Sequence, residues 1–147
     1  MSGVSARTLV RDAVMGTLVG RQDTTGPRIP LYDVVPNFLA SEECKRFPTY
    51  CVVVTDETPQ AFTQEQREYQ LTVMVVIWAK HERDVRAALD AAIEDVYDAM
   101  LQVQQSLMGI AWKLVLDGIT TDDGATATKP HAQAVQRWMC SFGRAPR

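Results

Sequence analysis

The sequence predicts an α+β fold, with a mostly antiparallel sheet of four strands or slightly more and two main helices packed on one face. Two segments repeat apolar residues at helical spacing, residues 5–20 and 81–107. Four others are β-branched or alternate apolar and polar residues, as strands do: residues 49–55, 67–80, 112–123 and 131–142. This order predicts a single domain over residues 1–147.

The first predicted helix is followed by a turn and then by a proline-rich segment. Residues 5–20 carry one apolar stripe, and the turn-forming residues 20–27 end the helix. Residues 28–47 are rich in proline, which a central strand does not tolerate. We therefore expect short extended pieces there, with a helical turn near residues 41–46.

The first two long strands are separated by a polar segment. Residues 49–55, TYCVVVT, predict a short strand. Residues 56–68 are polar and contain Pro59, so they are predicted to be an extended hairpin loop. A connection of this length is usually functional or disordered.

The predicted strand at residues 67–80 has apolar residues on both faces, so something must cover its second face. Side chains alternate across a strand, and one face here is wholly apolar. The other begins polar and becomes apolar at Met74, Val76 and Trp78. The two helices can cover only the first face. Either a neighbouring subunit covers the second, or residues 27–46 fold over it within one chain.

The C-terminal half supplies the longest helix and two further strands. Residues 81–107 keep helical spacing, and Gly109 ends the helix. Residues 112–123 alternate, with Leu114 and Leu116 on one side of the strand. A flexible turn within residues 121–130 then leads into the final strand.

Composition excludes several classes of function. The 147 residues hold 18 acids against 15 Lys and Arg, a net charge of -3, which argues against a basic nucleic-acid footprint. Three cysteines without a CxxC indicate reduced thiols. The N-terminus does not read as a signal peptide, and the longest apolar run, residues 73–79, is too short for a membrane span.

Catalytic and metal-binding patterns are weak. No phosphate-binding, dinucleotide-binding, metalloprotease or nucleophile-elbow motif occurs. His81 and His131 are far apart and are expected to be solvated ends of elements. Cys44 and Cys51 fit no common zinc spacing. We therefore expect no enzyme activity, no cofactor and no metal.

Carboxylates and aromatic residues also have a structural explanation. Asp122 and Asp123, with Asp117, could serve acid–base chemistry or bind a cation, but a solvated turn is the better explanation. The tryptophans are expected to belong to the core, as aromatic residues on strands usually do. Function is therefore expected to reside in surfaces.

The sequence resembles the tail terminator proteins of long-tailed bacteriophages over about residues 4–143. FPTYCVVVTDE is a Phe-Pro pair leading into an apolar strand that ends in acids, and a polar loop follows. REYQLTVMVVIWAK is a charged lead into a long strand, after which comes a long helix. A strand running into the Asp-rich turn GITTDDGATA and a final strand complete the pattern. The proline-rich residues 27–46 and the short basic tail after Phe142 depart from it and leave the tail type open.

The resemblance implies a structural virion protein of the phage neck, assembled in the host cytoplasm. Such a protein forms a ring, usually a hexamer, that caps the tail tube and ends its polymerisation. Its partners would be its own copies, the tail tube protein, the head–tail connector (stopper) protein and, in contractile phages, the tail sheath. DNA would pass through the lumen without specific binding, and no membrane is involved. The acidic chain agrees, because like charge keeps DNA from sticking.

Three surfaces are candidates for contact with the tube, the connector or a neighbouring subunit. They are the polar segment of residues 56–68, the second face of the long strand, and the turn of residues 121–130. The candidate residues are Asp56, Glu57, Gln60, Phe62, Gln64, Glu65, Arg67, Glu68, Met74, Val76, Trp78, Asp122 and Asp123.

Other functions remain open at this point. One is a head completion, stopper or adaptor protein of the neck, for which a twelvefold ring would favour an adaptor. Another is a small ligand-binding or enzymatic α+β domain, which would need a pocket where polar groups converge. A third is a host module that dimerises by adding strands edge to edge.

Overall fold

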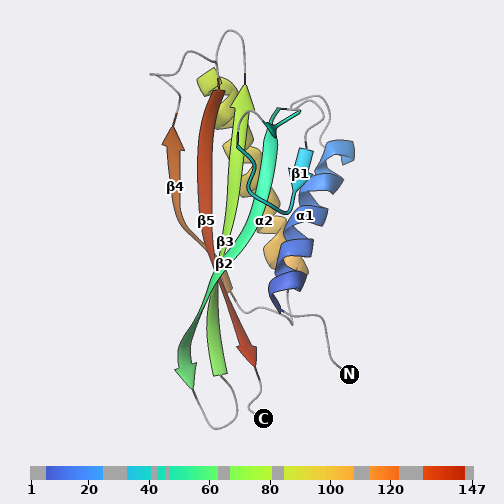
Figure 1. Ribbon diagram of the computed structural model, residues 1–147. Coiled ribbons are helices and arrows are strands. Elements are labelled where there is room, and N and C mark those ends of the chain that lie inside the picture. The colour runs from blue at the N-terminus through green and yellow to red at the C-terminus, as the bar shows by residue number, and fades with distance from the viewer. Residues whose placement is uncertain are drawn as a thin grey trace.

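The computed structural model describes residues 6–24, 33–40, 43–45, 47–62, 67–80, 85–107, 113–122 and 131–144. Within them the chain forms two helices and five strands (Figure 1). In chain order these are α1 Ala6–Thr24, β1 Asp33–Val35, β2 Thr49–Phe62, β3 Arg67–Lys80, α2 Val85–Ser106, β4 Lys113–Asp122 and β5 His131–Arg144. The predicted α+β class is confirmed.

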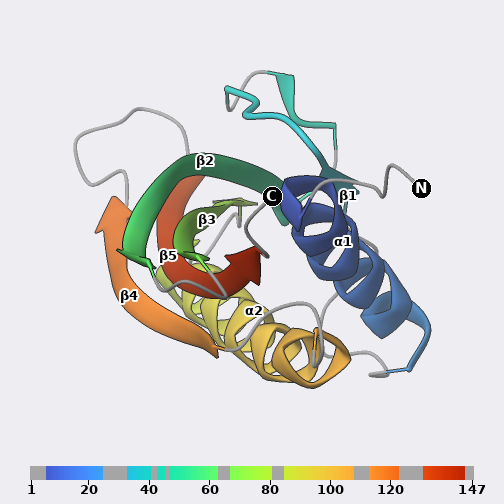
Figure 2. The same ribbon diagram turned by 90° about the horizontal axis from the view of Figure 1, so that it is seen from below.

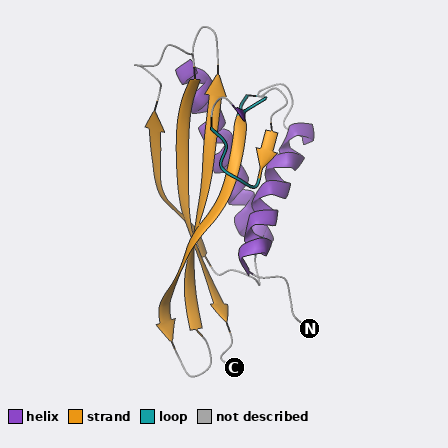
Figure 3. Ribbon diagram, in the orientation of Figure 1, coloured by secondary structure: helices purple, strands orange, loops and turns teal. Residues whose placement is uncertain are grey.

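The strands form one sheet in the order β1-β2-β3-β5-β4. β1 pairs parallel with β2, and every other pair of neighbours is antiparallel. Both helices pack on the same face, α2 against β3 and β5, and α1 against β1 and β2 (Figures 1 and 3). The view from below shows the sheet curving beside the two helices (Figure 2). We call the covered face the helix face and the opposite one the outer face.

The helix face forms the core because its elements carry matching apolar patterns. One side of β3 is fully apolar and buried, and α1 and α2 contribute stripes at helical spacing. Burying a large aliphatic side chain stabilises the fold by about 1.5–3 kcal/mol, so the stripes hold the layers together. The principal members are Val10, Val14, Leu18, Leu71, Val73, Val75, Ile77, Leu89, Val96, Met100 and Val103.

One helix end differs from prediction. α1 continues through Gly20 to Thr24 and does not stop at the predicted breakers. A glycine inside a helix costs only about 1 kcal/mol, which the packing of α1 offsets. α2 begins at Val85, while residues 81–84 and Gly109 lie outside the described residues.

The proline-rich segment contributes β1, which is the short extended piece expected there. The predicted helical turn near residues 41–46 is present at Glu43, whose backbone N–H donates to the carbonyl of Ala40 at 3.0 Å. β1 is the strand that takes the sheet beyond four.

Three strands extend past the rest of the molecule as an arm. Lys113, the first residue of β4, pairs with Ser141, so β5 continues beyond the end of β4. Residues 59–62 of β2, 67–69 of β3 and 142–144 of β5 pair with one another there. We call these segments the three-stranded arm. It projects below the helices in Figure 1, where the twist of the sheet has reversed the left-to-right order of β2, β3 and β5.

The predicted hairpin loop at residues 56–68 is wrong, because most of it is strand. β2 runs on to Phe62, which pairs with Arg67 of β3. Pro59 is tolerated because no described strand flanks β2 on its other side beyond Cys51. Register shifts between Val54 and Glu57 and between Pro59 and Ala61 absorb the irregular sequence.

Candidate interaction surfaces

The described residues hold no assembled metal site, since no three His, Cys, Asp or Glu side chains cluster closely enough to bind an ion. His81, Trp112 and Asp123 lie outside the described residues, as does the side chain of His131. Asp117 instead lies 3.9 Å from the guanidinium Nε of Arg137. None of the described helices is long and apolar enough to cross a membrane.

The three cysteines all lie among the described residues and form no disulfide. Cys51 and Cys140 are buried, and Cys44 is half-buried. Burial raises the pKa of Cys140 to about 11, and burial is also the largest cause that raises the pKa of Cys51. Both side chains are therefore neutral near pH 7 and are poor nucleophiles.

A polar network inside the core joins β5 to α2. Gln136 is fully buried, and its side-chain amide donates to the carbonyl of Ile93 at 2.7 Å. Its oxygen accepts from the indole N–H of Trp138 at 2.9 Å, and the Trp138 ring lies 5.7 Å from that of Tyr97. The side-chain amide of Gln136 and the indole N–H of Trp138 each have a partner, so the network is structural. The expectation that tryptophans belong to the core is met at Trp138.

The arm carries most of the candidate residues from the polar segment. Gln60, Phe62, Arg67 and Glu68 lie on its paired strands, and Gln64 and Glu65 lie outside the described residues. At the root of the arm, the rings of Tyr69 and Phe142 stack with centroids 5.8 Å apart. This stacked pair ties the arm to the core.

The two acids of the polar segment lie where β2 is irregular. The register shift between Val54 and Glu57 contains Asp56, which is exposed, whereas Glu57 is half-buried. Arg7 of α1 donates from its guanidinium to the carbonyl of Val54 at 3.1 Å. The helix layer thus holds β2 at the point where the exposed part of the strand begins.

The upper end of the outer face is covered within one chain. The indole N–H of Trp78 donates to the carbonyl of Leu39 at 2.7 Å. On the same face, Cys51 is fully buried and Val76 is 3% exposed. The segment between β1 and β2 crosses in front of β2, on the side away from α2 (Figure 3). Of the two alternatives, the proline-rich segment therefore covers Val76 and Trp78, while Met74 stays half-exposed.

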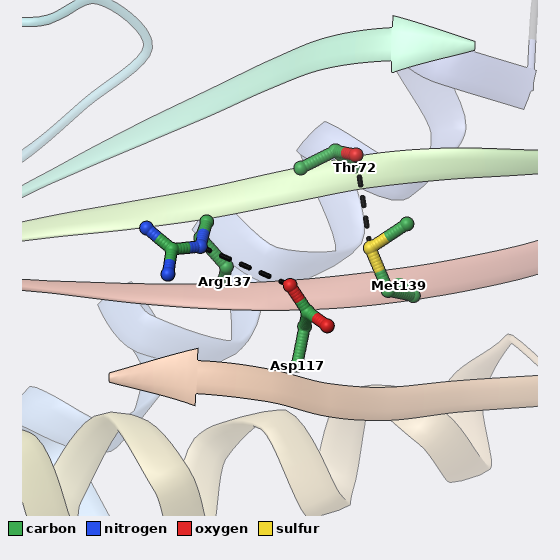
Figure 4. A network of polar contacts seen from close by, with 4 residues as sticks. All are labelled: Thr72, Asp117, Arg137 and Met139. Atoms are coloured by element: carbon green, nitrogen blue, oxygen red, sulfur yellow. Dashed lines mark hydrogen bonds and ion pairs between the residues drawn. The ribbon is translucent and has the colours of Figure 1, made fainter. Parts of the chain in front are cut away.

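Below this cover, the outer face carries a row of contacts across three strands. Thr72 of β3 donates to the sulfur of Met139 of β5 at 3.7 Å, and Arg137 of β5 reaches Asp117 of β4 (Figure 4). Together with Met74, these residues form a mixed polar and apolar surface.

β4 is the most exposed strand of the sheet. Of the predicted 121–130 turn, the structure describes Thr121 and Asp122, and both are exposed strand residues at the end of β4. Two apolar residues of this strand are exposed, Val115 by 42% and Ile119 by 40%. They were not identified as surface residues from the sequence. Their β-branched character marks them as strand residues, but it does not show that they are exposed.

The outward side of α2 was also missed. Tyr97 and Leu101 are 36% and 43% exposed. Asp90, Glu94 and Asp98 are exposed at intervals of four residues along the same helix. That spacing was readable in the sequence as a solvated acidic stripe beside two apolar residues.

Two comparisons with known proteins bear on this arrangement. A sequence profile described as Bacteriophage Tail Tube Terminator Protein matches residues 4–109. The match covers most of the 147-residue chain, from α1 to the end of α2. No curated protein shows significant similarity to the chain.

Proposed function

The chain belongs to the bacteriophage tail tube terminator proteins, and from this premise we propose that it works as a non-enzymatic ring that needs no cofactor and caps the tube. The ring, most simply a hexamer, occupies the surface on which the next tube ring would polymerise. Its opposite side docks the head–tail connector in the neck of the virion. In a contractile phage the sheath is a further partner.

The three-stranded arm is the observation that carries this proposal. Residues 59–62, 67–69 and 142–144 project past both helices, so they can reach a partner that the body does not touch (Figure 1). Stacking of Tyr69 on Phe142 and the bond from Arg7 to Val54 fix the direction of the arm. A fixed projection loses little conformational entropy when it docks.

A cyclic ring needs two different surfaces on each subunit, because its contacts are heterologous. The described residues offer apolar groups on opposite sides of the molecule. Tyr97 and Leu101 are exposed on α2, and Met74 is half-exposed on the outer face. We assign these two surfaces to the contact between neighbouring subunits, and Asp122 to the rim.

The acidic balance of the chain suits a ring that lets DNA slide. The net charge is -3, and the exposed stripe of Asp90, Glu94 and Asp98 adds local negative charge. Phosphates bind proteins mainly through Lys and Arg, so such a lumen does not grip DNA.

Tube assembly in the presence of the protein tests the proposal. Purified tube protein is polymerised with and without the chain, and the tube lengths and ends are imaged by negative-stain electron microscopy. We expect shorter tubes with a sixfold ring at one end. Tubes that keep growing at the same rate, with bare ends, would contradict capping. Binding to the connector alone, as a twelvefold ring, would instead identify an adaptor.

A further inference from the structure

The sheet has two edges, and they are built differently. Past Cys51, no described strand flanks β2, but this edge is broken by Pro59 and two register shifts. Such features hinder the addition of another strand to an edge. β4 has no described strand on its outer side, contains no proline and has a single register shift, between Leu116 and Gly118. β4 is therefore the less obstructed of the two edges, provided that a second strand can accommodate its bulge.

The bulge in β4 changes which of its residues share a face. In an unbroken strand, Lys113 and Asp122 would point to opposite faces, because side chains alternate. In this strand Lys113 pairs with Ser141, and Asp122 pairs with Gln133. Ser141 and Gln133 are an even number of residues apart on β5, so Lys113 and Asp122 both belong to the outer face. The bulge therefore places the two charged ends of β4 on the same face of the sheet.

Because both charged ends lie on one face, β4 can pair with the β4 strand of a second copy so that opposite charges meet. In an antiparallel pair centred between Asp117 and Gly118, each Lys113 lies opposite Asp122 of the other copy. On the outer face Val115 then meets Thr120, and on the helix face Leu116 meets Ile119. Opposite charges and β-branched pairs directly across from one another stabilise antiparallel strands. Pairing also covers Val115 and Ile119, which are 42% and 40% exposed in one chain.

We propose that β4 is the interface between two copies of this chain in the free protein, related by a twofold axis between Asp117 and Gly118. The occupant is a second copy because β4 carries its own complement of charge, Lys113 at one end and Asp122 at the other. Near the axis, Arg137 offsets the charge of each Asp117 at 3.9 Å.

The twofold pair is distinct from the ring. A twofold contact closes on itself after two copies and cannot propagate around a cyclic ring. The pair is a state of the free protein, and neither it nor the capping role depends on the other. Failure of one in its own assay leaves the other intact.

Charge exchange at the ends of β4 tests the interface. Sedimentation velocity over a wide concentration range measures the dimer dissociation constant of the wild type, of Lys113→Asp, of Asp122→Lys and of the double exchange. We expect a wild-type dimer, an about tenfold weaker dimer for each single variant, and recovery in the double variant. Circular dichroism checks that each variant is folded.

A disulfide provides a second, independent reading. In the proposed pair, Val115→Cys and Thr120→Cys face each other at about 4.5–5.5 Å between Cα atoms, which a disulfide spans. Within one strand they are about 16 Å apart and cannot react. Mild oxidation of the double variant should give a covalent dimer, and either single variant should not. A monomeric wild type at every concentration, a dimer indifferent to both single charge exchanges, or no crosslink would overturn the proposal.

Discussion

The body of the molecule and its arm are held together in different ways. In the body, α1, α2 and the sheet bury a shared apolar core. In the arm, three strands continue past β4. They are held by backbone pairing between the strands and by the stacking of Tyr69 on Phe142. The difference teaches that stability and partner binding can be changed separately. Substitutions in the body should act on unfolding, and substitutions in the arm should act on tube capping.

The largest effect is expected in the helix layer of the body. Met100 is fully buried on α2, whereas the adjacent Leu101 is 43% exposed. Met100→Ala should lower the free energy of unfolding by about 3 kcal/mol because it leaves a cavity. Leu101→Ala, the matched control, should change it by about 0.5 kcal/mol and weaken ring assembly instead. Equal losses in urea denaturation would contradict the assignment of the two sides of α2.

The buried network on β5 should show the next largest effect. Gln136→Leu leaves the indole N–H of Trp138 buried without its acceptor and Ile93 without its side-chain donor. We expect a loss of about 2 kcal/mol in unfolding free energy. Gln133→Leu, on the same strand but on the half-exposed outer face, should be nearly neutral. A neutral Gln136→Leu would show that the network does not stabilise the body.

Alkaline pH should also act on the body. The folded chain raises the pKa of Cys140 from 9.0 to about 11, because burial disfavours the thiolate. The stabilising contribution is complete below the unfolded pKa and is lost as pH rises through the folded value. The unfolding free energy should therefore fall between about pH 9 and 11, more steeply in the wild type than in Cys140→Ala. Parallel pH profiles would contradict the effect.

A smaller effect is expected where the proline-rich segment covers the outer face. Trp78→Phe removes the bond to the carbonyl of Leu39 and should cost about 1 kcal/mol. Loosening this cover should also make the buried Cys51 react faster with a thiol reagent. Met74→Leu, lower on the same face, is the control and should leave both readouts unchanged. Unaltered labelling of Cys51 in Trp78→Phe would show that the segment is held by other contacts.

Hydrophobic periodicity predicted the helices and strands of the body better than those of the arm. The alternation from Leu71 to Ile77 and the stripe of α2 identify buried faces directly, because burial selects residues one by one. Residues 56–62 resemble a loop locally, since they are polar and contain Pro59. They are strand because β3 pairs with them, and such long-range pairing overrides local preference.

Two features of the candidate surfaces also could not be predicted from local sequence patterns. The cover over Trp78 depends on a backbone carbonyl 39 residues away, at Leu39, which no periodicity reveals. The bulge between Leu116 and Gly118 shifts the phase of β4, so alternation read from its first half misplaces the second. Asp56 and Glu57 were recognised as candidates, although their place in an irregular strand was not.

Shortening the arm most directly tests whether it carries the capping function. Ala61 and Glu68 are paired, so residues 62–67 can be replaced by Asn-Gly, a two-residue turn that suits a hairpin. Urea denaturation and tube-length measurement are then made on the same preparation, with Val19→Ala on the exposed side of α1 as a surface control. We predict an unfolding free energy within about 1 kcal/mol of wild type together with tubes that are no longer capped. Capping at wild-type efficiency by the shortened protein would contradict the assignment of function to the arm.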